Sequence, residues 1–81
     1  MLTQQEALER AWDLIHRQQI RVRRLRSVQI AAAPGFLPEW ATRGDVWEVM
    51  FDLDVPPGMS PDATLMIVDR ETGDAAFVQL T

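Results

Sequence analysis

The feature that most constrains this fold is an alternation in DVWEVMFDLDV, residues 45 to 55, in which every second residue from Trp47 to Val55 is apolar and most of the residues between are acidic. Successive side chains of a β-strand point to opposite faces, so a period of two predicts a strand that is buried on one side only. We expect this half-buried antiparallel strand to cover about residues 46–55. Its apolar face carries Trp47, Val49, Phe51, Leu53 and Val55. Another element must therefore cover that face.

A helix is predicted before this strand. TQQE at residues 3–6 has the form of a capping box, in which the side chains of Thr3 and Glu6 each accept a hydrogen bond from the other's backbone amide. Apolar residues then recur at helical spacing, at Leu8, Ala11, Trp12 and Ile15. The pattern predicts a helix over about residues 4–19 with one apolar stripe.

Three further strands are expected, over about residues 25–33, 64–69 and 75–80. On the first of these strands, the residues expected to face the core are Val28, Ile30 and Ala32. A helix followed by a meander of four strands is an α+β arrangement. We therefore predict a single domain over residues 1–81, with the helix packed on one face of a four-stranded antiparallel sheet.

The last two strands flank RETGD, residues 70–74, which is typical of a hairpin turn with Gly73 at a positive φ. Alternation assigns to the core face Leu65, Ile67, Val78 and Leu80. The apolar residues that then fall on the outer face are Met50, Met66, Val68 and Phe77. One helix covers only one face of a sheet, so these residues predict an outer-face interface, of which a homodimer is the simplest form.

Three segments resemble the PepSY-like and cystatin-like small domains, namely TQQEALERA at 3–11, VWEVMFDL at 46–53 and MIVDRETGDAAFV at 66–78. The shared features are a T-x-x-E-A helix start, a strand with an aromatic residue and valines, and a V-D-x-x-T-G hairpin. The matching positions are Thr3, Glu6, Ala7, Trp47, Val49, Val68, Asp69, Thr72 and Gly73. The layout is also similar to that of bacterial immunity proteins that neutralise a toxin domain. The resemblance implies a cystatin-like fold and a role in binding or inhibition, with no catalytic residues to carry over.

Five of the eight arginines lie within RQQIRVRRLR, residues 17–26. Residues 1–26 carry six arginines against three acids, whereas residues 27–81 carry two against nine, so the net charge of −4 conceals a basic start. Three interpretations are open for these arginines: ion pairs with a neighbouring acidic strand face, an acidic partner protein, or nucleic acid. Nucleic acid is the least favoured, because a free nucleic-acid binder usually has a basic excess over the whole domain.

No pattern for catalysis or metal binding stands out. His16 is the only histidine, and neither a serine elbow nor a second histidine at zinc-binding spacing accompanies it. Glu48, Asp52 and Asp54 share one strand face, where carboxylates either bind a cation or meet solvent, and strand alternation favours solvent. No glycine-rich phosphate loop is present. We expect no catalytic residue, no cofactor and no metal.

The sequence also bears on location. No apolar run approaches the roughly 18 residues that span a bilayer, so no membrane partner is expected. The first ten residues, MLTQQEALER, carry charges where a secretory signal needs an apolar stretch. The chain has no cysteine, so it forms neither disulfides nor a thiolate zinc site. These features predict a cytoplasmic protein.

The loop PGFLPEWATRGD, residues 34–45, carries Trp40, which either packs back over the core or stays exposed as an interaction anchor. We predict a non-enzymatic protein-binding domain, an immunity-type or inhibitory protein that captures its partner by shape and charge. The expected partner-binding residues are Arg21, Arg23, Arg24, Arg26, Trp40, Met50, Met66 and Phe77. The alternative is a nucleic-acid-associated accessory or regulatory protein that uses the 17–26 segment.

Overall fold

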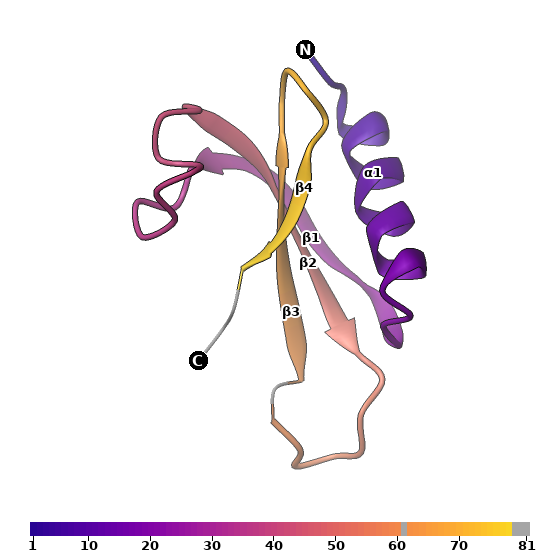
Figure 1. Cartoon of the computed structure of the whole chain (residues 1–81). Helices are drawn as coiled ribbons and strands as arrows, with labels where there is room; N and C mark the ends of the chain where they lie inside the picture. Colours follow the sequence, from indigo (N-terminus) through magenta and orange to yellow (C-terminus); the bar gives the residue numbers. More distant parts are fainter. Residues whose placement is uncertain (61, 79–81) are drawn as a thin grey trace.

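The chain folds into one helix and one four-stranded sheet. The structure, a computed structural model, describes residues 1–60 and 62–78. Its elements are α1 (Gln4–Arg17), β1 (Val22–Ala32), β2 (Asp45–Leu53), β3 (Ala63–Asp69) and β4 (Ala75–Val78). All neighbouring strands pair antiparallel in the order β1-β2-β3-β4, with α1 against one face of the sheet (Figure 1). The predicted α+β meander is confirmed.

The helix begins where the capping box places it and ends two residues earlier than predicted. Thr3 caps α1 and exchanges hydrogen bonds with Glu6 as expected. At the other end Gln19 adopts φ 55, in the left-handed region that terminates helices. This position is usually glycine, so a glutamine there does not predict the end of the helix, and β1 begins at Val22 rather than near residue 25. The predicted last strand ran to residue 80, and residues 79 and 80 lie outside the described part of the chain.

Two irregularities in β1 explain why its apolar residues do not alternate. The register with β2 shifts between Val22 and Arg24 and again between Leu25 and Ser27. Each β-bulge inserts one extra residue, so Val22, Leu25 and Val28 recur at intervals of three and still pack against the core under α1. The residues predicted to face the core, Val28, Ile30 and Ala32, do lie on the α1 side of the sheet, since Val28 and Ile30 pair with Val49 and Trp47. Only Val28 packs into the core, because Ile30, at 46 % exposed, and Ala32, also exposed, lie beyond the part of the sheet that α1 covers.

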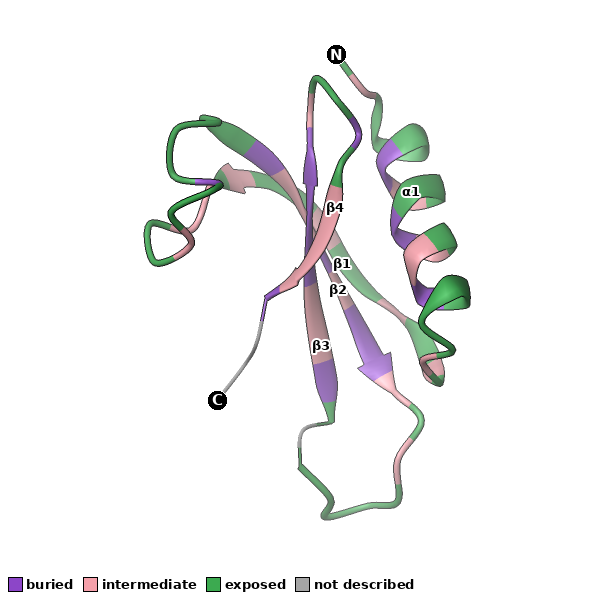
Figure 2. Cartoon of the chain, viewed as in Figure 1, coloured by how far each residue is buried: buried purple, intermediate pink, exposed green. Residues whose placement is uncertain are grey.

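The first core lies between α1 and the sheet. Ala7, Ala11 and Ile15 line the buried stripe of α1, which Figure 2 shows in purple on the side toward the sheet. The opposing residues of the sheet are Val49, Phe51, Met66 and Val68. The Trp12 ring meets the Phe51 ring edge to face, with centroids 4.8 Å apart. The alternation predicted for the central strand is confirmed, because Val49 and Phe51 face α1.

The assignment of faces on the last two strands was wrong. Met66, Val68 and Phe77, predicted to point outward, face α1, whereas Leu65, Ile67 and Val78 lie on the other side of the sheet. The register is the reason: β3 pairs with β2 so that Met66 lies opposite Val49, and opposite residues share a face. The sequence TLMIV is apolar on both faces, so its pattern alone does not fix the phase.

Candidate functional site

The outer face of the sheet, opposite α1, is covered by the chain's own loop. In Figure 1 the loop between β1 and β2 lies to the left of the sheet and α1 to the right. Trp40 of this loop is only 6 % exposed and packs in a second core with Val46, Ile67 and Val78. Trp40 was expected either to cover the core or to stay exposed, and the structure shows the first. The predicted role of Trp40 as an exposed interaction anchor is therefore wrong.

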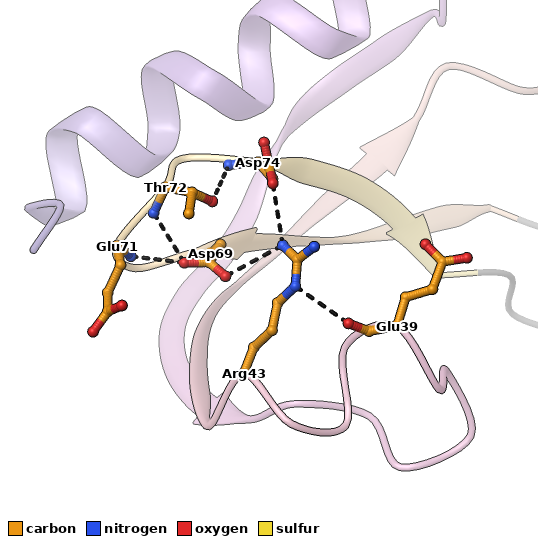
Figure 3. Close-up of polar contacts among 6 residues, drawn as sticks. All are labelled: Glu39, Arg43, Asp69, Glu71, Thr72 and Asp74. Carbon is orange, nitrogen blue, oxygen red and sulfur yellow. Dashed lines mark hydrogen bonds and ion pairs between the residues drawn. The ribbon is translucent and has the colours of Figure 1, made fainter.

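Arg43 holds this loop in place from three directions. Its guanidinium carbon lies 4.2 Å from the centre of the Trp40 ring, within cation–π range. Its Nη1 lies 3.2 Å from Asp69 Oδ2 and 3.3 Å from Asp74 Oδ2, and its Nε donates to the Glu39 carbonyl at 3.3 Å (Figure 3). The loop is thereby tied to the β3–β4 hairpin.

Asp69 organises that hairpin. Its Oδ1 accepts hydrogen bonds from the amides of Glu71 at 2.8 Å and Thr72 at 3.0 Å, and the Thr72 hydroxyl accepts one from the Asp74 amide at 3.2 Å (Figure 3). The hydrogen bond from the Thr72 amide, with that from Glu71 and the charge of Arg43, holds the pKa of Asp69 below its ordinary value despite burial. The V-D-x-x-T-G pattern is therefore a structural turn, with Gly73 at φ 80.

Of the apolar half of the predicted partner-binding set, Trp40 and Met66 are buried, whereas Met50 and Phe77 are half-buried. Met66 is fully buried under α1, and Phe77 packs against the same core. Met50 lies half-buried on the outer face, with its Sδ 3.6 Å from Arg26 Nη1. The prediction of an uncovered apolar outer face is therefore wrong, because the phase of β3 and the position of Trp40 were both missed. The homodimer stays a prediction, but the outer face of the sheet is no longer the surface that we expect to form it.

The arginine half of the set gathers at the start of β1 and is exposed. We call Arg21, Arg23, Arg24 and Arg26 the basic end of β1. Arg24 Nε donates to Asp52 Oδ2 at 2.7 Å while its side chain stays 74 % exposed. Arg26 forms a close ion pair with the other oxygen of Asp52, outside hydrogen-bond geometry. Arg23 Nη2 lies 3.9 Å from Asp54.

These pairs settle part of the question about the arginines. Asp52 is buried, and the hydrogen bond from Arg24, followed by the contact with Arg26, keeps the pKa of Asp52 below its ordinary value. Glu48 accepts a hydrogen bond from Gln29 Nε2 at 3.0 Å. The acidic face of β2 is thus occupied by its neighbours, as the structural interpretation expected. Four arginines against two carboxylates still leave the basic end with an excess of positive charge.

A hollow of about 440 Å³ adjoins the basic end. Arg23 and Arg26 line one part of it, Asp52 and Asp62 another, and the loop from 55 to 60 closes the remainder. Both charges are present on its wall, so it has no preference for an anion or a cation, and we assign no ligand to it.

β1 is also an edge of the sheet, and its hydrogen-bonding phase can be read from two bonds. The Ala33 amide donates to the Gly44 carbonyl and the Asp54 amide to the Arg21 carbonyl, each at 3.1 Å. In an antiparallel ladder only alternate residues bond to a given neighbour, so in the regular part of β1 it is Ser27, Gln29 and Ala31 that bond to β2. The backbone groups of residues 28, 30 and 32 therefore point to the open edge. The predicted meander already implies that β1 is an edge, but its bulges and its hydrogen-bonding phase could not be predicted without the register against β2.

Residues 1–60 and 62–78 include no helix that is long and apolar enough to cross a membrane. Among the same residues, no three side chains of the metal-ligating types gather as a metal site requires. His16 is exposed in the last turn of α1, 6.1 Å from the Trp12 ring between centroids.

In comparisons with known proteins, no family model, no curated protein and no solved structure matches this chain. The resemblance to PepSY-like and cystatin-like domains and to immunity proteins therefore stays a prediction. What the protein does has to be argued from its own residues.

Proposed function

We propose that this protein is a non-enzymatic binding domain that captures an acidic segment of a partner protein at the basic end of β1. The observation that carries the proposal is the gathering of four exposed arginines on one sheet edge of a protein whose net charge is −4. Exposed arginines are favoured at interfaces because one guanidinium binds a carboxylate through two parallel hydrogen bonds. Complementary charge also speeds association.

A protein partner is favoured over nucleic acid. A phosphate backbone needs a continuous positive surface, whereas Asp52 and Asp54 stand among these arginines, and β2 and β3 carry acidic but no basic residues. Single strands are usually bound with aromatic side chains between the basic ones, and the segment from 17 to 32 has none. An acidic polypeptide places separate carboxylates that reach individual arginines.

The biological role that fits such a surface is inhibition or immunity, in which a small domain blocks its target by occupying it. The proposal rests on the charge pattern and on the resemblance in layout to immunity proteins. We further propose a cytoplasmic location, where cysteine-free proteins are common.

The test compares two variants that carry the same net charge. Arg21→Gln with Arg23→Gln removes two positive charges from the basic end, and Gln4→Glu with Gln5→Glu adds two negative charges at the exposed start of α1. Both variants have a net charge of −6. Arg24 and Arg26 are left in place because Asp52 depends on them. Binding of a glutamate-rich peptide and of a DNA duplex is measured at about 50 mM salt, where non-specific affinity for DNA is readily detected.

We expect the wild-type protein and the helix variant to bind the acidic peptide alike and the arginine variant to bind it about tenfold more weakly. Added salt should weaken all of these interactions. Equal affinity of the two variants would contradict the proposal, since net charge and not the basic end would then decide. Tighter binding of DNA than of the acidic peptide would favour the nucleic-acid alternative instead.

A further inference from the structure

We infer that the partner segment binds as an added antiparallel β-strand along the open edge of β1, and that it alternates apolar and acidic residues. The inference rests on the proposed function and names the chemistry of its partner. β1 is an edge strand whose pairing with β2 is regular from Ser27 to Ala32, beyond the two bulges. An edge of this kind can accept another strand through main-chain hydrogen bonds.

The bonding groups are identified by the phase of the ladder. The amides and carbonyls of Val28, Ile30 and Ala32 point away from β2, as the bond from Ala33 to Gly44 requires. No described segment of the chain covers this side of β1. Three donors and three acceptors are thus presented in a row, at the alternate spacing that a strand needs.

The two faces of β1 specify the side chains of the added strand. Ile30 lies opposite Trp47, on the α1 side of the sheet, and is 46 % exposed, so it presents apolar surface beside the open edge. Arg24 and Arg26 contact Asp52 and Met50, so they lie on the outer side. In an antiparallel pair, residues that exchange hydrogen bonds share a face. The partner residues that bond to 28, 30 and 32 should therefore be apolar, and the alternate residues acidic.

A second copy of this chain fits the edge less well. In the described part of the chain the edges that it offers are β1, which is itself basic, and β4, whose four residues Ala75–Val78 carry no charge. The carboxylate next to β4, that of Asp74, already pairs with Arg43. An acidic strand from a different protein supplies carboxylates beside the arginines and adds charge complementarity to the backbone bonds.

The experiment uses the full chain and a synthetic peptide of about eight residues that alternates valine and glutamate, an ordinary strand length. Two copies carry N-methyl groups, one on every valine amide and the other on every glutamate amide. A fourth peptide has the same composition in scrambled order. N-methylation removes a donor without changing charge, so each copy blocks one edge of the peptide strand. Affinities are measured by the fluorescence anisotropy of labelled peptides.

We expect methylation of the valine amides to weaken binding by about tenfold or more and methylation of the glutamate amides to leave it within about twofold. The scrambled peptide should also bind weakly. If all four peptides bind alike, the added strand is wrong while acidic capture at the basic end stands. If none binds at low salt, both the added strand and the proposed function are wrong.

A pair of protein variants also tests whether the outward backbone amides of β1 bind the peptide. Ile30→Pro removes the outward amide at the centre of the edge, and proline is tolerated on edge strands where its missing donor faces solvent. Ile30→Thr keeps the amide and removes only apolar surface. We expect the proline variant to lose the peptide and the threonine variant to retain most of its affinity, with circular dichroism to show that both are folded. Equal binding by both variants would overturn the added strand.

Discussion

Asp69 joins two parts of the chain, the turn between β3 and β4 and the loop between β1 and β2, where its partner Arg43 lies 26 residues away in the sequence. Because its pKa is lowered in the folded protein, the stabilisation it provides is complete above the unfolded value, about 3.9, and is lost as the pH falls through the folded value. We expect Asp69→Asn to lower the free energy of unfolding at pH 7 by about 1–2 kcal/mol, because the charged partner of Arg43 is lost.

Urea denaturation between pH 2 and 7 checks this. Below about pH 4 the wild type should lose stability more steeply than Asp69→Asn, whose remaining slope comes from groups such as Asp52, whose pKa is also lowered. Parallel curves for the two proteins would show that Asp69 does not contribute in the way its contacts indicate.

Gly73 has a conformational and a steric reason to be glycine. It adopts φ 80, and a Cβ built there would lie 3.1 Å from Arg10 Nε. Gly44 offers a matched control, since it adopts φ 75 with open space around a Cβ. We expect Gly44→Ala and Gly73→Ala each to cost about 1–2 kcal/mol from the left-handed backbone. The variant at 73 should cost more than the one at 44, and Arg10→Ala should remove that difference in urea denaturation. A difference that persists without Arg10 would contradict the steric reason.

At the scale of elements, the loop from 33 to 44 behaves as a second layer of the fold. Trp40 is the largest side chain of the second core, and Phe36, in the same loop, is 69 % exposed. We expect Trp40→Ala to lower the free energy of unfolding by about 3–5 kcal/mol, since it empties a buried aromatic site. Phe36→Ala should change it by less than about 0.5 kcal/mol. Chemical denaturation of both variants tests this, and equal effects would mean that the loop does not pack as described.

Elements whose apolar residues mostly follow a single period were the ones predictable from the sequence. The central strand and the helix each have a one-sided pattern, and both were placed correctly to within two residues at the ends. β3 is apolar on both faces, so nothing in its own residues separates the two phases. β1 has two bulges, and a pattern with a period of two fails where an extra residue enters.

The candidate site was predictable in the same measure. The arginine cluster is visible in the sequence, and its pairing with the acidic face of β2 was one of the three interpretations left open; the bulges of β1 prevent alternation from deciding among them. The burial of Trp40 depends on Arg43, three residues later, and on carboxylates of a distant hairpin. The W-x-x-R spacing was the available signal, because residues three apart lie on one side of a helical turn. The predicted meander places β1 at an edge, whereas the backbone groups that face outward depend on the register with β2.

For the molecule as a whole, both faces of the sheet are closed by its own chain, one by α1 and the other by the outer loop. What remains open is an edge, with bulges and arginines over one half and a regular ladder over the other. Charges and bulges on an edge strand hinder uncontrolled pairing with other chains. The arginines of β1 therefore favour acidic partners, and the regular half of β1 is free to pair with an acidic strand.

Amide hydrogen exchange along β1 in the free protein tests this most directly. The amides of Gln29 and Ala31, which bond to β2, should exchange slowly, and those of Val28, Ile30 and Ala32 should exchange fast, as exposed amides do. Uniformly slow exchange from residue 28 to residue 32 would show that this edge is already covered, by a second copy or by another part of the chain, and would contradict an open binding edge.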